Sequence, residues 1–315
     1  MKKPSDIRRV AVVGTGAVGA SWCAYFLSRG LEVQATDPAP GAEERLNAFI
    51  DRIWPILESL GLEEGASLER LRFRADLATA LAGADFVQEN GPESLDGKRQ
   101  LYAQIEQHVD EDVIIATSSS GLLMSDVQSA CKTPGRCVVG HPFNPPHLLP
   151  LVEVVGGRLT SAETIDASMA FYAAIGKRPI RILKEVPGHV ANRLQAALWR
   201  EAASLAHEGV ASVGDIDAAV TCGPGLRWAL MGPTLTLHLG GGAGGLQHFV
   251  DHLGDSFQRW WDDLGTPQLD ASLRSFLVEA IQTQTEGRPV DELASERDRL
   301  LLEMVRLTRT KNLLP

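Results

Sequence analysis

The most constraining part of this chain is residues 10–30, "VAVVGTGAVGASWCAYFLSRG". Its first four residues form the apolar run that a strand buried on both faces requires, and its second half has the apolar spacing of a helix. The turn between them carries Gly14, Gly16 and Gly19 in the pattern G-x-G-x-x-G. Gly14 allows the tight turn, Gly16 allows a pyrophosphate to approach the backbone, and Gly19 allows the helix to pack on the strand. We therefore predict a dinucleotide-binding turn rather than an ordinary glycine-rich loop.

A carboxylate follows this unit where a dinucleotide site needs one. The second apolar run, residues 31–36, ends just before Asp37. An acid about 20 residues beyond the glycines accepts a hydrogen bond from the ribose 2′-OH and repels a 2′-phosphate. The start of the helix adds free N–H groups and partial positive charge for the phosphates. The pattern favours NAD over NADP, with FAD as an alternative that later residues disfavour.

Strands and helices alternate along the first part of the chain. We expect further strands at residues 84–90, 113–120, 137–142, 151–155 and 178–183, and helices at 94–109 and through the Glu-, Leu- and Arg-rich residues 41–82. Such alternation predicts a doubly wound sheet. From Pro187 onward the apolar spacing is helical, and residues 240–245 ("GGGAGG") are expected in a loop between helices rather than in a second phosphate cradle. We predict a Rossmann-type α/β domain with a mostly parallel sheet (1–186), followed by an all-α domain (187–315).

Composition narrows the class of partner. The chain has 315 residues and a net charge of −10, and no basic stripe or membrane-length apolar run is evident. An acidic protein of this kind is poorly suited to nucleic acid or to an anionic membrane surface. The four cysteines form no C-x-x-C pair. They are typical of reduced thiols, so we expect a cytoplasmic location.

Polar side chains follow several of the predicted strands. Ser118 to Ser120 and His141 lie at the ends of predicted strands, and Asp37 directly follows one. Such positions gather at the ligand-binding edge of an open sheet. Glu153 lies inside an apolar strand, where an unpaired carboxylate is costly. A histidine partner would satisfy it, fix the tautomer of the ring and raise the basicity of the other nitrogen. We predict a His141–Glu153 dyad that takes a proton from an alcohol while hydride passes to NAD⁺.

Each of these side chains also has a structural interpretation. A histidine after a strand can be structural, an acid can lie at a bulge or an edge, and hydroxyls can satisfy the backbone at a strand end. Their occurrence together favours catalysis. Asn192 lies on the next predicted helix, away from the apolar stripe that runs from Val190 to Leu205. It is either solvent-facing or aimed at a substrate oxygen.

Five motifs resemble those of the 3-hydroxyacyl-CoA dehydrogenase family over nearly the whole chain. They are "VVGTGAVGASW", "ENGPESLDGK", "ATSSSGLLMSD", "GHPFNPPHLLPLVEVV" and "VPGHVANRLQ". The resemblance implies that His141 is the catalytic base, that Glu153 is its partner, and that Ser120 and Asn192 bind the substrate. It also implies a set of NAD-binding residues: Gly14, Gly16, Ala17, Val18, Gly19 and Asp37 for the adenosine and pyrophosphate, and Glu93 and Lys98 for the nicotinamide half. The last two residues could otherwise be an exposed pair at a helix start.

Residues 223–239 resemble a branch of the family that acts on free 3-hydroxy acids and includes L-gulonate 3-dehydrogenase (lambda-crystallin) and L-carnitine 3-dehydrogenase. The expected reaction is therefore oxidation of the 3-hydroxyl of a short free 3-hydroxy acid to the 3-oxo acid. A CoA thioester substrate and a non-catalytic NAD-binding structural protein are the alternatives. Arg227 could anchor the carboxylate bidentately, or form a surface salt bridge. The resemblance implies an acid at the position of Asn192 in carnitine enzymes, which favours another 3-hydroxy acid.

Other side chains of the helical domain give weaker indications of a ligand site, a metal site or a subunit contact. Trp260 and Trp261 could surround a quaternary ammonium, although tryptophans lie more often at domain or subunit contacts, as we expect for Trp228. His248 and His252 have the spacing of metal ligands, but no third ligand is evident, so we expect no metal. The family resemblance implies that the helical domain binds substrate and dimerises, and we expect a homodimer.

Overall fold

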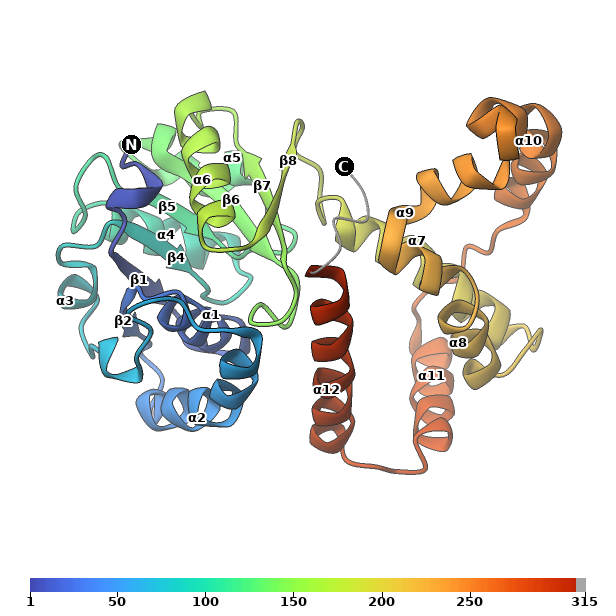
Figure 1. Ribbon diagram of the computed structural model, residues 1–315, viewed down its shortest axis with the longest axis horizontal. Helices are drawn as coiled ribbons and strands as arrows, with labels where there is room; N and C mark the ends of the chain where they lie inside the picture. The colour runs from blue at the N-terminus through green and yellow to red at the C-terminus, as the bar shows by residue number, and fades with distance from the viewer. Residues whose placement is uncertain (310–315) are drawn as a thin grey trace. The chain divides into compact units, whose positions relative to one another are not determined.

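The structure is a computed structural model that describes residues 1–309. The chain divides into two compact units, the first ending at Asn192 and the second beginning at Arg193. The first is a sheet with helices on both faces, and the second is entirely helical (Figure 1). None of the helices within residues 1–309 combines the length and the apolar character needed to span a lipid bilayer.

The first unit is built on an eight-stranded sheet of order β3-β2-β1-β4-β5-β6-β7-β8 (Figure 1). The strands are β1 (Arg9–Val13), β2 (Glu32–Thr36), β3 (Leu71–Phe73), β4 (Phe86–Glu89), β5 (Ile114–Thr117), β6 (Cys137–Pro142), β7 (Leu151–Gly156) and β8 (Arg178–Ile182). Neighbouring strands are parallel except β6 and β7, which are antiparallel. The strand order reverses between β1 and β4, and a ligand crevice forms at such a point beyond the carboxyl ends of the strands.

The helices fall into two groups along the chain. Those of the sheet unit are α1 (Ala17–Ser28), α2 (Ala42–Leu60), α3 (Leu77–Leu81), α4 (Leu95–Ile105), α5 (Met124–Val127) and α6 (Ala162–Ala174). The later helices are α7 (Ala191–His207), α8 (Val213–Thr221), α9 (Pro224–Gly240), α10 (Gly245–Asp263), α11 (Ala271–Gln284) and α12 (Val290–Arg309). The prediction of a doubly wound, mostly parallel sheet followed by an all-α part is confirmed.

Two apolar cores cover the two faces of the sheet. Val10 and Val12 of β1 point to the face packed by α1, α2 and α6, whereas Ala11 and Val13 point to the face packed by α3, α4 and α5. This alternation explains why the strands are continuous apolar runs. Phe26 of α1 is fully buried, and burying a side chain of this kind stabilises a fold by about 1.5–3 kcal/mol.

The expectation of helix throughout residues 41–82 was wrong in its second half. After α2 the chain forms the edge strand β3, which pairs with β2 alone, and then the short α3. A strand of three residues shows no measurable period in the sequence, because a period of two needs at least four residues to recur. Of the segment 240–245, Gly240 ends α9 and Gly245 begins α10. The residues between them connect the two helices as expected, and residues 242–244 form a single 3₁₀ turn.

Candidate active site

A cavity of about 720 Å³ opens at the glycine turn after β1. Its lining includes Gly14, Gly16 and Asp37 and the segment 90–92 that follows β4. Gly14 has φ +88°, and a Cβ there would lie 2.8 Å from the backbone carbonyl of Asn90. A Cβ on Gly16 would meet nothing within 4 Å. The first glycine is therefore required by the turn, whereas the second keeps open the space that a pyrophosphate would occupy.

The remaining groups at this cavity suit a dinucleotide. Asp37 is held in place because its Oδ2 accepts from the backbone N–H of Thr15 at 2.8 Å and its Oδ1 accepts from that of Ala39 at 2.9 Å. No side chain among the described residues caps the start of α1. The N–H groups of Ala17 and Val18 in its first turn therefore remain available for phosphate oxygens.

His141 and Glu153 face each other across the β6–β7 hairpin. They are Cα partners in the antiparallel register, so their side chains project from the same face of the sheet. The Nδ1 of His141 lies 2.8 Å from Oε2 of Glu153, and both side chains are buried. A carboxylate can only accept, so Nδ1 carries the proton and Nε2 of the neutral ring keeps a lone pair.

The second oxygen of Glu153 is held by the start of α7. Oε1 accepts from the backbone N–H groups of Val190 and Ala191, at 2.9 and 3.0 Å. Burial acts to raise the pKa of Glu153, but the hydrogen bonds from His141 and from these two N–H groups outweigh it and lower the pKa below its ordinary value. The acid therefore stays ionised beside the imidazole and orients the ring.

His189 is a second imidazole at the same place, and the sequence analysis did not single it out. Its ring centroid lies 5.3 Å from that of His141, its side chain is buried, and its φ is +51°. Nε2 lies 3.1 Å from the backbone carbonyl of Ser119, so Nε2 carries the proton. Within residues 1–309, its Nδ1 is buried without a hydrogen-bond partner. Burial and the neighbouring His141 lower the pKa of His189.

Ser120 and Asn192, both predicted at the substrate, come together in the structure. Nδ2 of Asn192 donates to the backbone carbonyl of Ser120 at 3.2 Å, and Ser120 is exposed. The neighbouring Ser118 forms part of a different network. Its hydroxyl donates to Oδ1 of Asn90 at 2.7 Å and accepts from the indole N–H of Trp22 at 3.2 Å. Ser118 thus satisfies buried polar groups at the strand end.

Lys98 is buried against the protein itself. Its Nζ lies 2.9 Å from each carboxylate oxygen of Glu89 and 3.1 Å from the backbone carbonyl of Gly91. Glu89 also accepts from the hydroxyl of Thr117 at 2.6 Å. The Lys98–Glu89 pair therefore fixes the segment that follows β4, which forms one wall of the 720 Å³ cavity.

Glu93 holds the loop that follows β5. Its Oε1 accepts from the hydroxyl of Ser119 at 2.6 Å and from the backbone N–H of Gly121 at 2.9 Å. Burial acts to raise the pKa of Glu93, but these hydrogen bonds and the charge of Lys98 lower it. Glu93 thus joins the segment after β4 to the serine loop beside His189.

The candidate residues of the second unit lie on α9 and α10. Arg227 and Trp228 are exposed on α9. On α10, the rings of Trp260 and Trp261 lie 4.8 and 6.5 Å from that of Phe257, and both tryptophans are exposed. The rings of His248 and His252 stack 6.1 Å apart. Across residues 1–309 no group of three His, Cys, Asp or Glu side chains is placed to hold a metal ion.

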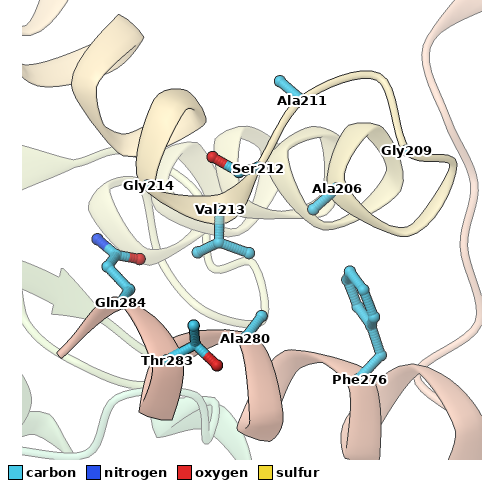
Figure 2. A pocket seen from close by; sticks show the side chains of 10 residues that line it. All are labelled: Ala206, Gly209, Ala211, Ser212, Val213, Gly214, Phe276, Ala280, Thr283 and Gln284. Atoms are coloured by element: carbon cyan, nitrogen blue, oxygen red, sulfur yellow. The ribbon is translucent and has the colours of Figure 1, made fainter. Parts of the chain in front are cut away.

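A second cavity, of about 560 Å³, lies within the helical unit between the α7–α8 connection and α11. Figure 2 shows Phe276, Ala280 and Thr283 of α11 facing Ala206 and Val213 across it. Its lining is mostly apolar and small, and it includes none of the site residues predicted from the sequence. This cavity therefore contributes no acid or base to the candidate chemistry.

Comparison with known proteins agrees with this geometry. Residues 9–186 match the family described as "3-hydroxyacyl-CoA dehydrogenase, NAD binding domain", and residues 188–267 match "3-hydroxyacyl-CoA dehydrogenase, C-terminal domain". An L-carnitine dehydrogenase of Streptomyces griseus subsp. griseus is 50% identical over 97% of this chain and 91% of its own length. One from Streptomyces coelicolor is 49% identical over 98% and 97%.

A solved structure is similar over the same range. The crystal structure of 5-formyl-3-hydroxy-2-methylpyridine 4-carboxylic acid 5-dehydrogenase, described as an NAD⁺-dependent dismutase, has a TM-score of 0.83 and 30% identity, and covers 97% of this chain and 100% of that one. The family match covers more than half of the chain, and its first part is an NAD-binding domain. This chain belongs to the 3-hydroxyacyl-CoA dehydrogenase family and is an NAD-dependent dehydrogenase that acts on a CH–OH group.

Proposed function

We propose that this protein oxidises the 3-hydroxyl of a free 3-hydroxy acid to the 3-oxo acid, and that its substrate is L-carnitine. Two relatives that are about half identical over nearly their whole length carry the name L-carnitine dehydrogenase. This similarity supports carnitine more strongly than the single difference expected at Asn192 argues against it. Arg227 is the proposed anchor for the substrate carboxylate, because a guanidinium binds carboxylate bidentately.

The observation that carries the proposal is the 2.8 Å contact between His141 and Glu153. The Nε2 of His141 removes the proton of the 3-hydroxyl, and Glu153 stabilises the imidazolium that forms. The N–H groups of Val190 and Ala191 keep the acid ionised and fixed. Ser120 and Asn192 are the proposed polar contacts of the substrate oxygen.

The glycine turn, the start of α1 and Asp37 are the proposed holders of NAD. Gly14, Gly16, Ala17, Val18 and Gly19 form the turn and first helical residues, and Asp37 lies at the same cavity. Bound NAD⁺ supplies the hydride acceptor. Glu93 and Lys98 support its nicotinamide half, in our proposal, through the loops that they fix. Residues 1–186 would thus bind the cofactor, and residues 187–315 would bind substrate and dimerise.

A homodimer in the cytoplasm fits two further observations. Leu194, Leu198 and Trp199 of α7 are exposed by 60%, 42% and 54% among the described residues, and apolar surface of this kind often marks a protein interface. All four cysteines are free thiols, as expected in a reducing compartment.

The test is NADH formation with a panel of alcohols. We expect the highest kcat/KM for L-carnitine. Gulonate and 3-hydroxybutyrate should be lower by at least about tenfold, because they lack the ammonium group of the proposed substrate. D-carnitine should also be lower by at least about tenfold, because its 3-hydroxyl and 3-hydrogen are exchanged in position when the carboxylate is held at one place. The main alternative is a thioester substrate, as the name of the family suggests. A clear preference for 3-hydroxybutyryl-CoA would establish that alternative and reject ours.

A further inference from the structure

Two thiols outside the proposed active site are in contact at the start of β6. Cys137 is the first residue of β6, and Cys131 directly follows the 3₁₀ turn of residues 128–130. Their Sγ atoms lie 3.7 Å apart, and both thiols are free. Neither has a role in the chemistry proposed above. We propose that Cys131 and Cys137 are a reversible dithiol–disulfide site that reacts with peroxides.

The two thiols differ in access and in acidity, as such a site requires. Cys137 is fully buried, whereas Cys131 is partly exposed. The S–H of Cys137 donates to Sγ of Cys131. This hydrogen bond lowers the pKa of Cys131, against the opposing effect of burial, and the same bond together with burial raises the pKa of Cys137. Cys131 is therefore the thiol that ionises more readily and meets the oxidant, and Cys137 is the thiol that resolves the product.

A peroxide is the oxidant that converts the Cys131–Cys137 dithiol to a disulfide in this proposal. The Cys131 thiolate attacks one peroxide oxygen, an S–O bond forms, the O–O bond breaks, and the departing hydroxide takes up a proton to give water. Cys137 then attacks the sulfur of the sulfenic acid, an S–S bond forms, the S–O bond breaks, and the thiol proton leaves with the hydroxide as a second water. The two thiols lose two electrons and the peroxide gains them.

The local structure allows the disulfide bond to form with a small displacement of the two sulfur atoms. The sulfurs must approach from 3.7 Å to about 2.05 Å, the length of a disulfide. Cys137 is fixed in the sheet opposite Ile115 of β5. Cys131 lies in the connection between two 3₁₀ turns and not in the sheet, so its side chain can supply most of the movement.

The experiment treats the full-length protein with hydrogen peroxide and follows each cysteine by peptide mass spectrometry. We expect one cross-linked species that has lost two hydrogen atoms, joins Cys131 to Cys137, and returns to the free thiols with dithiothreitol. Cys222, exposed at the end of α8, is the internal reference for an ordinary surface thiol, and Cys222→Ser should leave the cross-link unchanged.

The Cys137→Ser variant tests whether Cys137 reacts with oxidised Cys131 or merely lies beside it. Without Cys137, the sulfenic acid at Cys131 should gain a second oxygen and become a sulfinic acid that dithiothreitol does not reverse. Two results in the wild-type protein would overturn the proposal, whether or not the variant folds. One is oxidation of Cys222 while Cys131 and Cys137 remain thiols. The other is direct conversion of Cys131 to the sulfinic acid with no cross-link.

Discussion

At the residue scale, Glu153 is the more demanding member of the proposed proton-transferring pair. It receives three hydrogen bonds, one from His141 and two from the backbone at Val190 and Ala191. Every one of these partners donates, so both oxygens of Glu153 must accept. Only an ionised carboxylate satisfies this requirement, which explains why an acid lies inside an otherwise apolar strand.

This requirement predicts the effect of Glu153→Gln. The amide offers one accepting oxygen, and its NH₂ group must face a donor. We expect the free energy of unfolding to fall by about 1–3 kcal/mol, the cost of leaving a buried polar group unsatisfied. The kcat should fall by about 10²–10⁴, the range for general base catalysis. Denaturant unfolding and NADH formation measure the two effects. Glu111→Gln, at an exposed acid, is the control, and a variant at position 153 with normal turnover would contradict the mechanism.

The lowered pKa of His189 predicts a dependence of stability on pH. The unfolded residue titrates near 6.5, and the folded residue at a lower pH. Between these two values the unfolded state binds more protons, so the contribution of His189 is complete above about pH 6.5 and is lost as the pH falls toward the folded pKa. The neighbouring His141, Glu153 and Glu93 also affect the pKa of His189. The useful quantity is therefore the difference in pH dependence between the wild type and a variant at position 189.

We therefore compare the wild type with His189→Gln, whose amide can still donate to the carbonyl of Ser119. The free energy of unfolding should fall more steeply for the wild type than for the variant between about pH 8 and about pH 5.5. Equal slopes would mean that folding does not lower the pKa of His189. Unfolding curves in denaturant at several pH values provide the measurement.

The sequence predicts the contacts of these residues only where the expected strands already bring the partners together. The contact of His141 with Glu153 could be expected, because a histidine after one strand and an acid inside the next need each other. The orphaned nitrogen of His189 could not, because it depends on the left-handed backbone at this residue and on a carbonyl seventy residues away. The burial of Lys98 against Glu89 likewise depends on how a strand end meets a helix.

At the element scale, the turn between β1 and α1 makes different demands on its glycines. A Cβ on Gly19 would lie 1.9 Å from the backbone oxygen of Gly14, whereas a Cβ on Gly16 would lie in open space. Gly19→Ala should therefore force α1 away from the sheet and lower the melting temperature. Gly16→Ala should fold normally and weaken NAD binding by at least about tenfold, because the methyl group occupies the approach of the pyrophosphate.

Thermal unfolding and NAD titration together separate these two effects. The expectation is a stable Gly16→Ala protein with a high Kd for NAD, and an unstable Gly19→Ala protein. If Gly16→Ala bound NAD like the wild type, the cofactor would not lie against this turn. The position of the strand, turn and helix was predictable from the sequence alone. The start of α7 was not predictable: it begins at Ala191 rather than at Pro187. The N–H groups of Val190 and Ala191 donate to Glu153 and not to the backbone carbonyls of an earlier helical turn.

At the scale of the whole molecule, the helical unit buries few of its large apolar side chains. Buried apolar residues abound in the sheet unit, but in the described part of the helical unit they are Ala203, Ala206, Ile216, Leu273 and Val305. Leu194, Leu198 and Trp199 of α7 remain exposed. Since exposed apolar surface of this extent marks an interaction site, we infer that α7 packs against a second copy of the chain.

Light scattering after size exclusion tests this inference. We expect twice the chain mass of 34.0 kDa for the wild type, and a shift toward the single chain for Leu198→Asp, because a charge at the centre of an apolar contact is strongly disfavoured. Gln195→Asp, also at an exposed position of α7, introduces the same charge as a control. A wild-type protein that stays monomeric at high concentration would refute the dimer.

The hairpin of β6 and β7 determines which changes in sequence the proposed proton relay can tolerate. Both members of the proposed proton relay lie on one antiparallel ladder, with His141 opposite Glu153, and the loop of residues 143–150 joins the two strands. That loop can therefore change in sequence while the pairing of His141 with Glu153 stays intact. Displacing the ladder by one residue would instead send the acid to the opposite face and silence the enzyme in a single step.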